Sequence, residues 1–152
     1  MMPRVTGSPF SPFSRQEWAA WLDAMLRAAL GADQVPAVEL VLVRDGEIAA
    51  LNAVHLGCTG PTNILSFPDS ADDGHLGSLA LSVDTLHREC RLYGQNPAEY
   101  ARRLLAHGLA HLCGYDHGPL MDAACAELEA AAAKVLDVAA GEAAGLDAAR
   151  RV

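Results

Sequence analysis

The stretch that decides the fold is HGLAHLCGYDH, residues 107–117, which holds three of the six histidines of this 152-residue chain. Residues four apart share one face of a helix, so the side chains of His107 and His111 project together. Glycine adopts the positive φ that ends a helix, and Gly114 therefore lets the following turn bring His117 back toward the same point. The stretch predicts a helix, a tight turn and three imidazoles gathered where the two meet.

Three imidazoles in this arrangement predict a metal site. Zn²⁺ bound by three neutral imidazoles keeps its fourth tetrahedral position for water, which is typical of catalytic zinc, whereas structural zinc is closed by four protein ligands. Cys113 lies on a different helical face from His111 and is a poor fourth ligand. We therefore expect one Zn²⁺ per chain, held by His107, His111 and His117, although nickel, copper and iron also accept imidazole.

Strand and helix patterns surround this segment. Ser14, with Glu17 three residues later, has the pattern of a capping box and begins a helix that reaches about Leu30. The run VELVLV, residues 38–43, is rich in β-branched residues and predicts a strand. Two more strands are expected at 64–67 and 76–83, and further helices at 47–55, 84–93, 98–113 and 120–138.

The chain has the length of one domain, and neither a repeat nor a linker interrupts it. We expect this single domain to cover residues 14–138. Proline and glycine are frequent before residue 14 and disfavour a regular element there. The other expectations are a flexible lead-in over residues 1–13, a turn at 44–46 and a small, polar tail at 139–152 that can fray.

Composition and charge restrict the function. The net charge of −8 argues against a general nucleic-acid binder, because neutralising phosphates needs surplus Lys and Arg, but it leaves a local basic site open. The four cysteines form no C-x-x-C pair, which favours a reducing compartment. We find no signal-peptide pattern and no apolar run long enough to span a membrane, so we expect a cytoplasmic protein.

The spacing H-x-x-x-H-x-x-G-x-x-H is also that of the metzincin proteases. Those enzymes need Glu directly after the first histidine as general base. This chain has Gly108 at that position. A zinc metallopeptidase is therefore a disfavoured alternative.

The same stretch closely resembles the signature of the YbeY family, bacterial zinc-dependent endoribonucleases and ribosomal-RNA maturation factors. A second block agrees, with Leu51-Asn52 followed ten residues later by PTNILSFP, residues 61–68. A third block, LGSLALS at residues 76–82, stands where that family has its next strand. The resemblance covers about residues 36–137.

This resemblance implies an α+β domain with a small mixed β-sheet packed with several helices and a zinc site on a central helix and the following turn. It implies a single-strand-specific endoribonuclease for maturation and quality control of small-subunit ribosomal RNA. The implied partners are ribosomal RNA, the small ribosomal subunit with its proteins, and a ribosome-assembly GTPase.

The chain departs from the family pattern at two positions. Family members usually carry Arg where this chain has Leu56, and Asp where it has Ser78. An arginine can grip a phosphate or stabilise developing charge, and leucine can do neither. A protonated His55 is a candidate substitute. The metal ligands are thus complete while the expected phosphate-binding side chain is missing, which places catalytic competence in question.

The leading hypothesis is metal-assisted hydrolysis of phosphodiester bonds in single-stranded RNA. Asp116, next to His117, is a candidate to orient a ligand imidazole or accept a proton, or else a turn residue that satisfies backbone amides. Thr62, Asn63 and Ser66 are candidates to line the cleft, with a turn-capping role equally open for Asn63.

Two other functions remain as alternatives. One is a ribosome-assembly factor with weak or no activity, which binds the small subunit while zinc holds the helix and turn together. The other is the metallopeptidase considered above.

Overall fold

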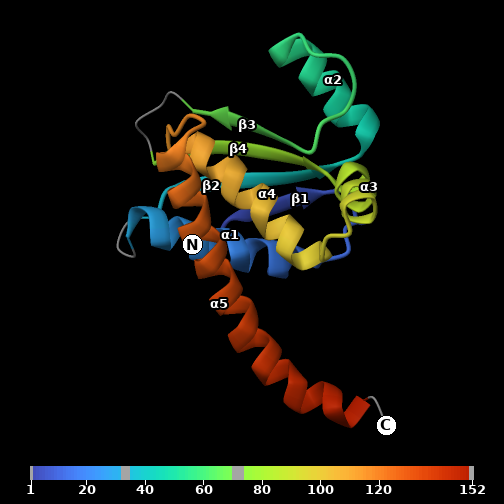
Figure 1. Cartoon of the computed structure of the whole chain (residues 1–152), viewed down its shortest axis with the longest axis vertical. Helices are drawn as coiled ribbons and strands as arrows, with labels where there is room; N and C mark the ends of the chain where they lie inside the picture. The colour runs from blue at the N-terminus through green and yellow to red at the C-terminus, as the bar shows by residue number, and fades with distance from the viewer. Residues whose placement is uncertain (1, 32–34, 70–73, 151–152) are drawn as a thin grey trace.

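The computed structural model describes residues 2–31, 35–69 and 74–150, with side chains up to residue 135. The described chain forms five helices and one four-stranded sheet in a single domain (Figure 1). The elements in chain order are β1 (Arg4–Gly7), α1 (Arg15–Leu30), β2 (Ala37–Val43), α2 (Asp45–Leu56), β3 (Ile64–Pro68), β4 (His75–Ser82), α3 (Val83–Tyr93), α4 (Pro97–Leu112) and α5 (Pro119–Arg150).

The sheet is mixed, which confirms the predicted α+β class. Its strand order is β1-β2-β4-β3. The strands β1, β2 and β4 are parallel, and β3 runs antiparallel to β4 with Ile64 opposite Leu81 and Pro68 opposite Gly77. β3 is therefore an edge strand that is hydrogen-bonded on one side only.

Local sequence signals set most of the element boundaries. The Ser14 hydroxyl accepts the Glu17 N–H at 3.1 Å and caps α1, as predicted. The Asn96 side chain caps α4 in the same way, and Pro97 follows at the first helical position, where its missing N–H costs nothing. The predicted strands at 38–43, 64–67 and 76–83 are confirmed within one residue at each end.

Two local expectations are wrong. The lead-in contains a strand, β1, because Pro3 stands just before it and Gly7 is its last residue, paired with Leu42, so neither interrupts the pairing with β2. The predicted turn at 44–46 is the start of α2, whose first N–H at Asp45 is donated to the Asp84 carboxylate. The helix predicted at 120–138 continues through the tail as far as Arg150, the last described residue, and the expectation that this tail can fray stays a prediction.

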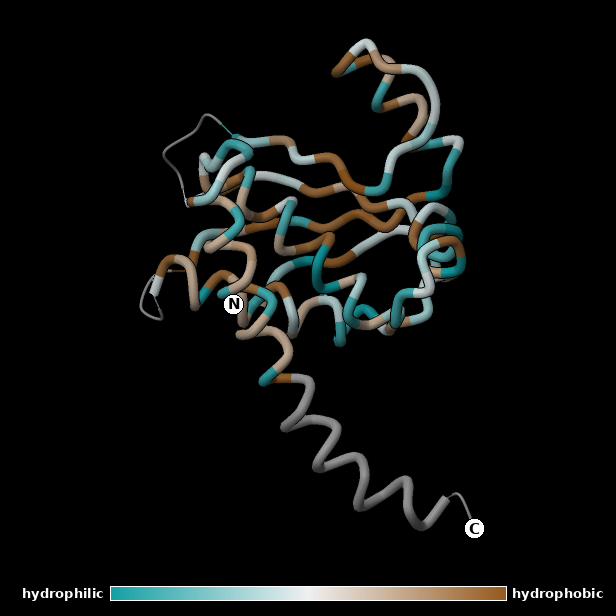
Figure 2. The backbone as a smooth tube through the Cα atoms, in the orientation of Figure 1, coloured by the Kyte–Doolittle hydropathy of each residue, from teal (hydrophilic) through white to brown (hydrophobic). Residues whose placement is uncertain are grey.

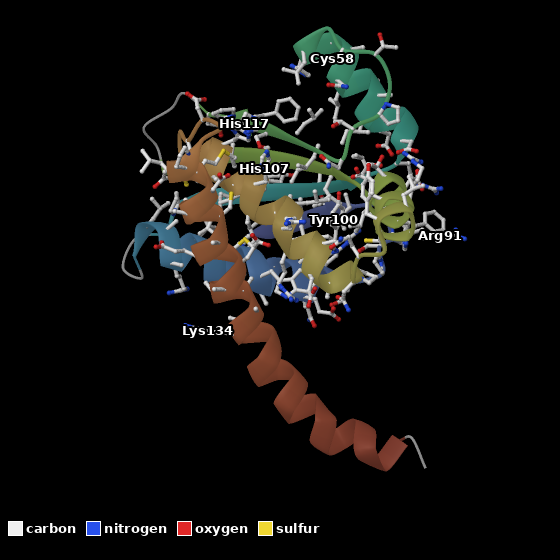
Figure 3. The ribbon with its side chains drawn as sticks, viewed as in Figure 1. Cys58, Arg91, Tyr100, His107, His117 and Lys134 are labelled. Atoms are coloured by element: carbon white, nitrogen blue, oxygen red, sulfur yellow. The ribbon has the colours of Figure 1, made fainter. Side chains whose placement is uncertain are left out.

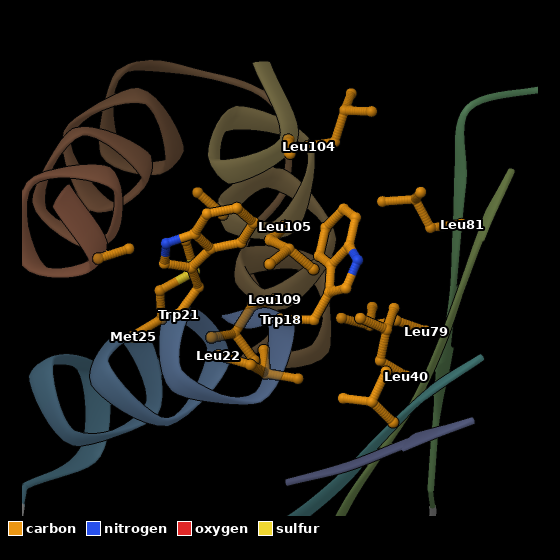
Figure 4. Packing of buried hydrophobic residues seen from close by; sticks show 14 of the residues in the cluster. Trp18, Trp21, Leu22, Met25, Leu40, Leu79, Leu81, Leu104, Leu105 and Leu109 are labelled. Atoms are coloured by element: carbon orange, nitrogen blue, oxygen red, sulfur yellow. The ribbon is translucent and has the colours of Figure 1, made fainter. Parts of the chain in front are cut away.

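Hydrophobic residues concentrate in the central strands and on the helix faces that meet them (Figure 2). The main core lies between one face of the sheet and helices α1, α4 and α5 (Figure 4). Trp18 and Trp21 of α1 are its largest side chains, and their rings meet edge to face with centroids 5.4 Å apart. Among the described helices, none is long and apolar enough to cross a bilayer.

The opposite face of the sheet is covered only in part, by α2. Ile48 of α2 packs there with Val43, Leu65 and Ala80 in a second, smaller cluster. Figure 1 shows α2 standing beyond the β3 edge of the sheet, with α3 the helix next to it.

Ion pairs and hydrogen bonds join the beginnings of α2 and α3. The Asp45 carboxylate accepts hydrogen bonds from the Ser82 and Thr85 hydroxyls at 2.8 and 2.7 Å and from the Arg88 guanidinium at 2.9 Å. Arg88 contributes most to lowering the pKa of Asp45, which falls from 3.8 to about 2, with the two hydroxyls adding to the effect. The charged form of Asp45 is thus favoured by folding.

We expect Asp45→Asn to lower the free energy of unfolding by about 1 kcal/mol at neutral pH, a value reduced for the partial exposure of the pair. Because the pKa of Asp45 is lower in the folded state, the unfolded state binds more protons. The stabilisation is therefore complete above the unfolded pKa of 3.8 and disappears as pH falls through about 2. Urea unfolding of variant and parent should show a difference that narrows with acidity.

Asp69→Asn is the matched control, since that exposed carboxylate has no hydrogen bond to any described residue. An Asp45→Asn difference that stays constant down to the lowest pH would contradict this account of the α2–α3 junction.

Candidate metal centre

Helix α4 carries two of the predicted ligands on a face that borders the core. Its inward side is buried along its whole length, from Tyr100 to Leu112. His107 and His111 are both half-buried, four residues apart on one side of the helix. The packing of α4 against the sheet thus fixes the direction in which both imidazoles project.

Gly108, between these histidines, is where α4 approaches the sheet most closely. A Cβ atom at this position would lie 2.7 Å from Ile64 Cδ1 of β3 and 3.0 Å from Leu79 Cδ2 of β4. Both distances are shorter than ordinary carbon–carbon contacts. A methyl group here would therefore force Ile64 and Leu79 to shift, and glycine fits this packing without any shift.

Two further contacts hold the same part of α4. The Ser66 hydroxyl of β3 donates a hydrogen bond of 2.9 Å to the Gly108 carbonyl. On β4, a Cβ atom at Gly77 would lie 2.8 Å from Leu112 Cδ2, so this glycine makes room for the last residue of α4. The final turns of α4, which carry both histidines, rest directly on β3 and β4.

The turn after α4 forms as predicted. Gly114 has φ +94°, a conformation that favours glycine, and its N–H is donated to the His111 carbonyl at 3.0 Å. The Tyr115 N–H is donated to the Ala110 carbonyl at 3.0 Å. These bonds reverse the chain and return His117, which is exposed, to the side chains of α4 (Figure 3).

The three imidazoles form one cluster. One ring nitrogen from each of His107, His111 and His117 lies within 4.8 Å of the others, and the ring centroids are 4.8 to 5.3 Å apart. Zinc–imidazole bonds of about 2.1 Å require nitrogens roughly 3.4 Å apart, so small side-chain rotations bring the set to bonding distance. The donor set fits a metal ion and leaves at least one coordination position open.

A backbone carbonyl orients one of the ligands. His111 Nδ1 lies 3.1 Å from the Tyr115 carbonyl oxygen, which can only accept a hydrogen bond. Nδ1 therefore carries the proton, and Nε2 presents its lone pair to a metal. The Tyr115 carbonyl lies within the turn that returns His117, so the same turn positions two ligands.

The surroundings also favour the neutral imidazole that metal binding requires. Burial lowers the pKa of His107 below its usual value, and the neighbouring His111 and His117 lower it further. Cys113 is half-buried against the core, and burial raises the pKa of its thiol. It does not belong to the imidazole cluster, in agreement with the sequence argument.

The other candidate residues lie around the site with different contacts. Asp116 is exposed and has no hydrogen bond or ion pair to any described residue, so its role stays a prediction. The Asn63 side chain accepts the Ile64 N–H and donates to Glu89 of α3, as a local structural role requires. Thr62 is half-buried without a hydrogen bond inside the described chain, and its contact with substrate also stays a prediction.

The end of α2 presents Leu56 and His55, the two residues that the family resemblance singled out. Leu56, the last residue of α2, has 62% of its surface exposed, so its side chain is free of the core. The exposed His55 ring lies edge to face with Phe67 of β3, with centroids 4.9 Å apart. No local sequence pattern indicates this contact or the Ser66 and Tyr115 hydrogen bonds, because all three form only in the folded chain.

Comparison with known proteins agrees with the fold. The family model described as "Endoribonuclease YbeY" matches residues 8–139. An endoribonuclease YbeY of Oleidesulfovibrio alaskensis is 48% identical over 134 residues, covering 73% of this chain and 78% of its own length. That of Lawsonia intracellularis is 44% identical, with 77% and 84% covered. A solution structure of a Thermotoga maritima protein shares the fold, with a TM-score of 0.67 at 21% identity over 93% and 95% of the two chains.

The α+β fold and its imidazole cluster define a small hydrolase-like protein with a candidate metal centre at the end of a central helix. The extent and identity of the matches narrow this class further. The chain belongs to the YbeY endoribonuclease family.

Replacing Gly108 tests whether close packing positions the ligand helix. We expect Gly108→Ala to lower the free energy of unfolding by about 1–2 kcal/mol, because Ile64 and Leu79 must give way to the new methyl group. Gly46→Ala in α2 is the matched control, since nothing lies within 4 Å of its Cβ position. It should be neutral or stabilising by about 0.5 kcal/mol, as expected for alanine in a helix. Equal unfolding midpoints for the two variants would contradict the close approach.

Proposed function

We propose that this chain is a zinc-dependent endoribonuclease that cleaves single-stranded RNA during maturation and quality control of small-subunit ribosomal RNA. The cluster of His107, His111 and His117 is the observation that carries the proposal. Its three neutral nitrogen donors suit zinc, and membership of the endoribonuclease family supplies the reaction class.

The division of labour in the site follows from its contacts. His107, His111 and His117 would hold the zinc ion, which would supply Lewis acidity for polarising a phosphoryl oxygen and for lowering the pKa of water toward about 7. Two of these residues stand on a helix packed closely on the sheet, and the Tyr115 carbonyl sets the tautomer of His111. Asp116 is close in sequence to the ligand His117 and is proposed as a proton acceptor.

Charge supports delivery of the RNA by a partner. A protein of net charge −8 repels a polyanion over distances greater than the site itself. An arginine without an ion pair could attract RNA to the site. Arg91 makes no ion pair with any described residue, but it lies at the end of the molecule opposite His107 and His117 and so does not serve this site (Figure 3). We therefore propose that the small ribosomal subunit, its proteins and an assembly GTPase bring the RNA to the site, and that activity on free RNA is weak.

One observation favours a second candidate function. Leu56 is the exposed last residue of α2, where an arginine would reach into solvent and be free to bind a phosphate. Without it the site lacks a phosphate-binding cation, so the alternative is an assembly factor that binds the small subunit and cleaves little. The peptidase alternative is opposed by packing, because a Glu side chain in place of Gly108 would have to enter the contact with Ile64 and Leu79.

Removing the metal or one ligand tests the proposed zinc dependence. We expect chelator treatment and His111→Ala each to lower cleavage of single-stranded RNA by at least about 100-fold, with activity restored to the parent by added Zn²⁺. Metal analysis of protein purified without an affinity tag of histidines should give one zinc per chain. His87→Ala, on α3, is the control for loss of an exposed histidine. Cleavage that survives both chelation and His111→Ala would overturn the proposal.

Restoring the family arginine tests the role of position 56. We expect Leu56→Arg to raise RNA cleavage by about tenfold without loss of stability, because the side chain is exposed and the new guanidinium can bind phosphate. Leu92→Arg makes the same charge change at another exposed leucine, with 69% of its surface accessible, and should leave cleavage unchanged. An equal rise in both variants would mean that net charge alone limits activity.

A further inference from the structure

We propose that Ser66 is a positioning residue of the metal centre, which sets the place of His107 and His111 by fastening the edge strand β3 to α4. This inference rests on the metal binding proposed above. The sequence alone suggests that Ser66 lines the substrate cleft. The inference instead gives Ser66 a role in positioning the ligands.

The first argument is the direction of the Ser66 hydroxyl. It donates a hydrogen bond of 2.9 Å to the carbonyl oxygen of Gly108, the residue that follows His107. A serine hydroxyl has one proton to donate. That proton is committed to the helix, so the hydroxyl cannot donate it to a phosphate at the same time.

The second argument is the place of β3 in the sheet. β3 is held by β4 on one side only, and its other edge has no strand partner among the described residues. Ile64 and Ser66 are two residues apart and lie on the face of β3 that meets α4, where the Ile64 side chain fills the space beside Gly108. The Ser66 hydrogen bond is thus a polar link between this edge strand and the ligand helix.

The third argument is the tightness of the surrounding contact. Ile64 and Leu79 leave no room for a side chain at Gly108, and Gly77 leaves none between β4 and Leu112. In a contact this close, the position of β3 and the position of the helix backbone depend on each other. Loss of the Ser66 hydrogen bond therefore removes one of the contacts that place the backbone between His107 and His111, and it moves both imidazoles relative to His117, the third proposed ligand.

The test compares the metal affinity of Ser66→Ala with that of the parent, by competition between the full-length protein and a chelator for Zn²⁺. We expect binding to weaken by about tenfold, the scale found when groups that orient metal ligands are removed. Ser66→Thr keeps the hydroxyl and should restore most of the affinity. Protein loaded with Co²⁺ should show shifted visible absorption bands in Ser66→Ala and parent-like bands in Ser66→Thr.

Ser14→Ala controls for general loss of stability. It removes another serine hydrogen bond, the α1 cap, which touches neither α4 nor β3, and it should leave the Zn²⁺ affinity unchanged. Equal weakening in Ser14→Ala and Ser66→Ala would overturn the proposal, since stability alone would then explain the loss.

The remaining outcomes separate this proposal from the proposed function. Unchanged Zn²⁺ affinity and Co²⁺ bands in Ser66→Ala, with RNA cleavage reduced through a higher KM, would overturn the positioning role and return Ser66 to the substrate cleft. A parent protein that binds neither metal would instead overturn the zinc dependence on which both proposals rest.

Discussion

The structure depends on one close contact, the approach of α4 to β3 and β4 at Gly108. This residue has no side chain, and the space that a Cβ would need is taken by Ile64 and Leu79. The helix backbone consequently lies against the sheet at the residue between the two histidines of α4. The direction of both imidazoles follows from the position in which this contact holds α4. The turn that returns His117 begins at the end of the same helix.

The same contact explains how one histidine spacing can serve different chemistry. In the metzincin pattern, the residue after the first histidine is a Glu that acts as general base. Here that position faces the sheet and not the open side of the metal centre. A proton acceptor in this chain must come from another element, and the turn with Asp116 is the nearest in sequence. Histidine spacing thus identifies a metal site, whereas the packing of the intervening residue decides which reaction is open to it.

Whether the sequence could predict a feature depends on how far apart along the chain the interacting residues lie. The Ser14 cap, the Gly114 turn and the pairing of His107 with His111 depend on residues within a few positions of each other, and all three predictions are confirmed. The start of α2 was missed because its capping carboxylate, Asp84, stands on α3 and was invisible to a local pattern.

Strand β1 was missed for a similar reason. Proline and glycine near a short segment disfavour a strand in any local pattern. The strand forms nevertheless, because it pairs with β2, which follows it in the chain only after the whole of α1. The Ser66 hydrogen bond belongs to the same class, since it joins residues on two elements that only the fold brings together. The imidazole cluster could therefore be predicted from sequence, but the contacts that hold its members in place could not.

An acidic protein can still carry a site for RNA, because net charge and a site cation act on RNA over different distances. Net charge governs the approach of a polyanion from solution, and screening limits that effect to about 10 Å at moderate salt. Within the site, the local field would be set by the cation that His107, His111 and His117 are proposed to hold. The proposed delivery of RNA by a larger assembly accommodates the acidic composition, because the assembly would supply the long-range attraction and the site only the short-range one. Leu56 fits the same proposal, since a site that received its substrate from a partner would depend less on an arginine of its own for capture.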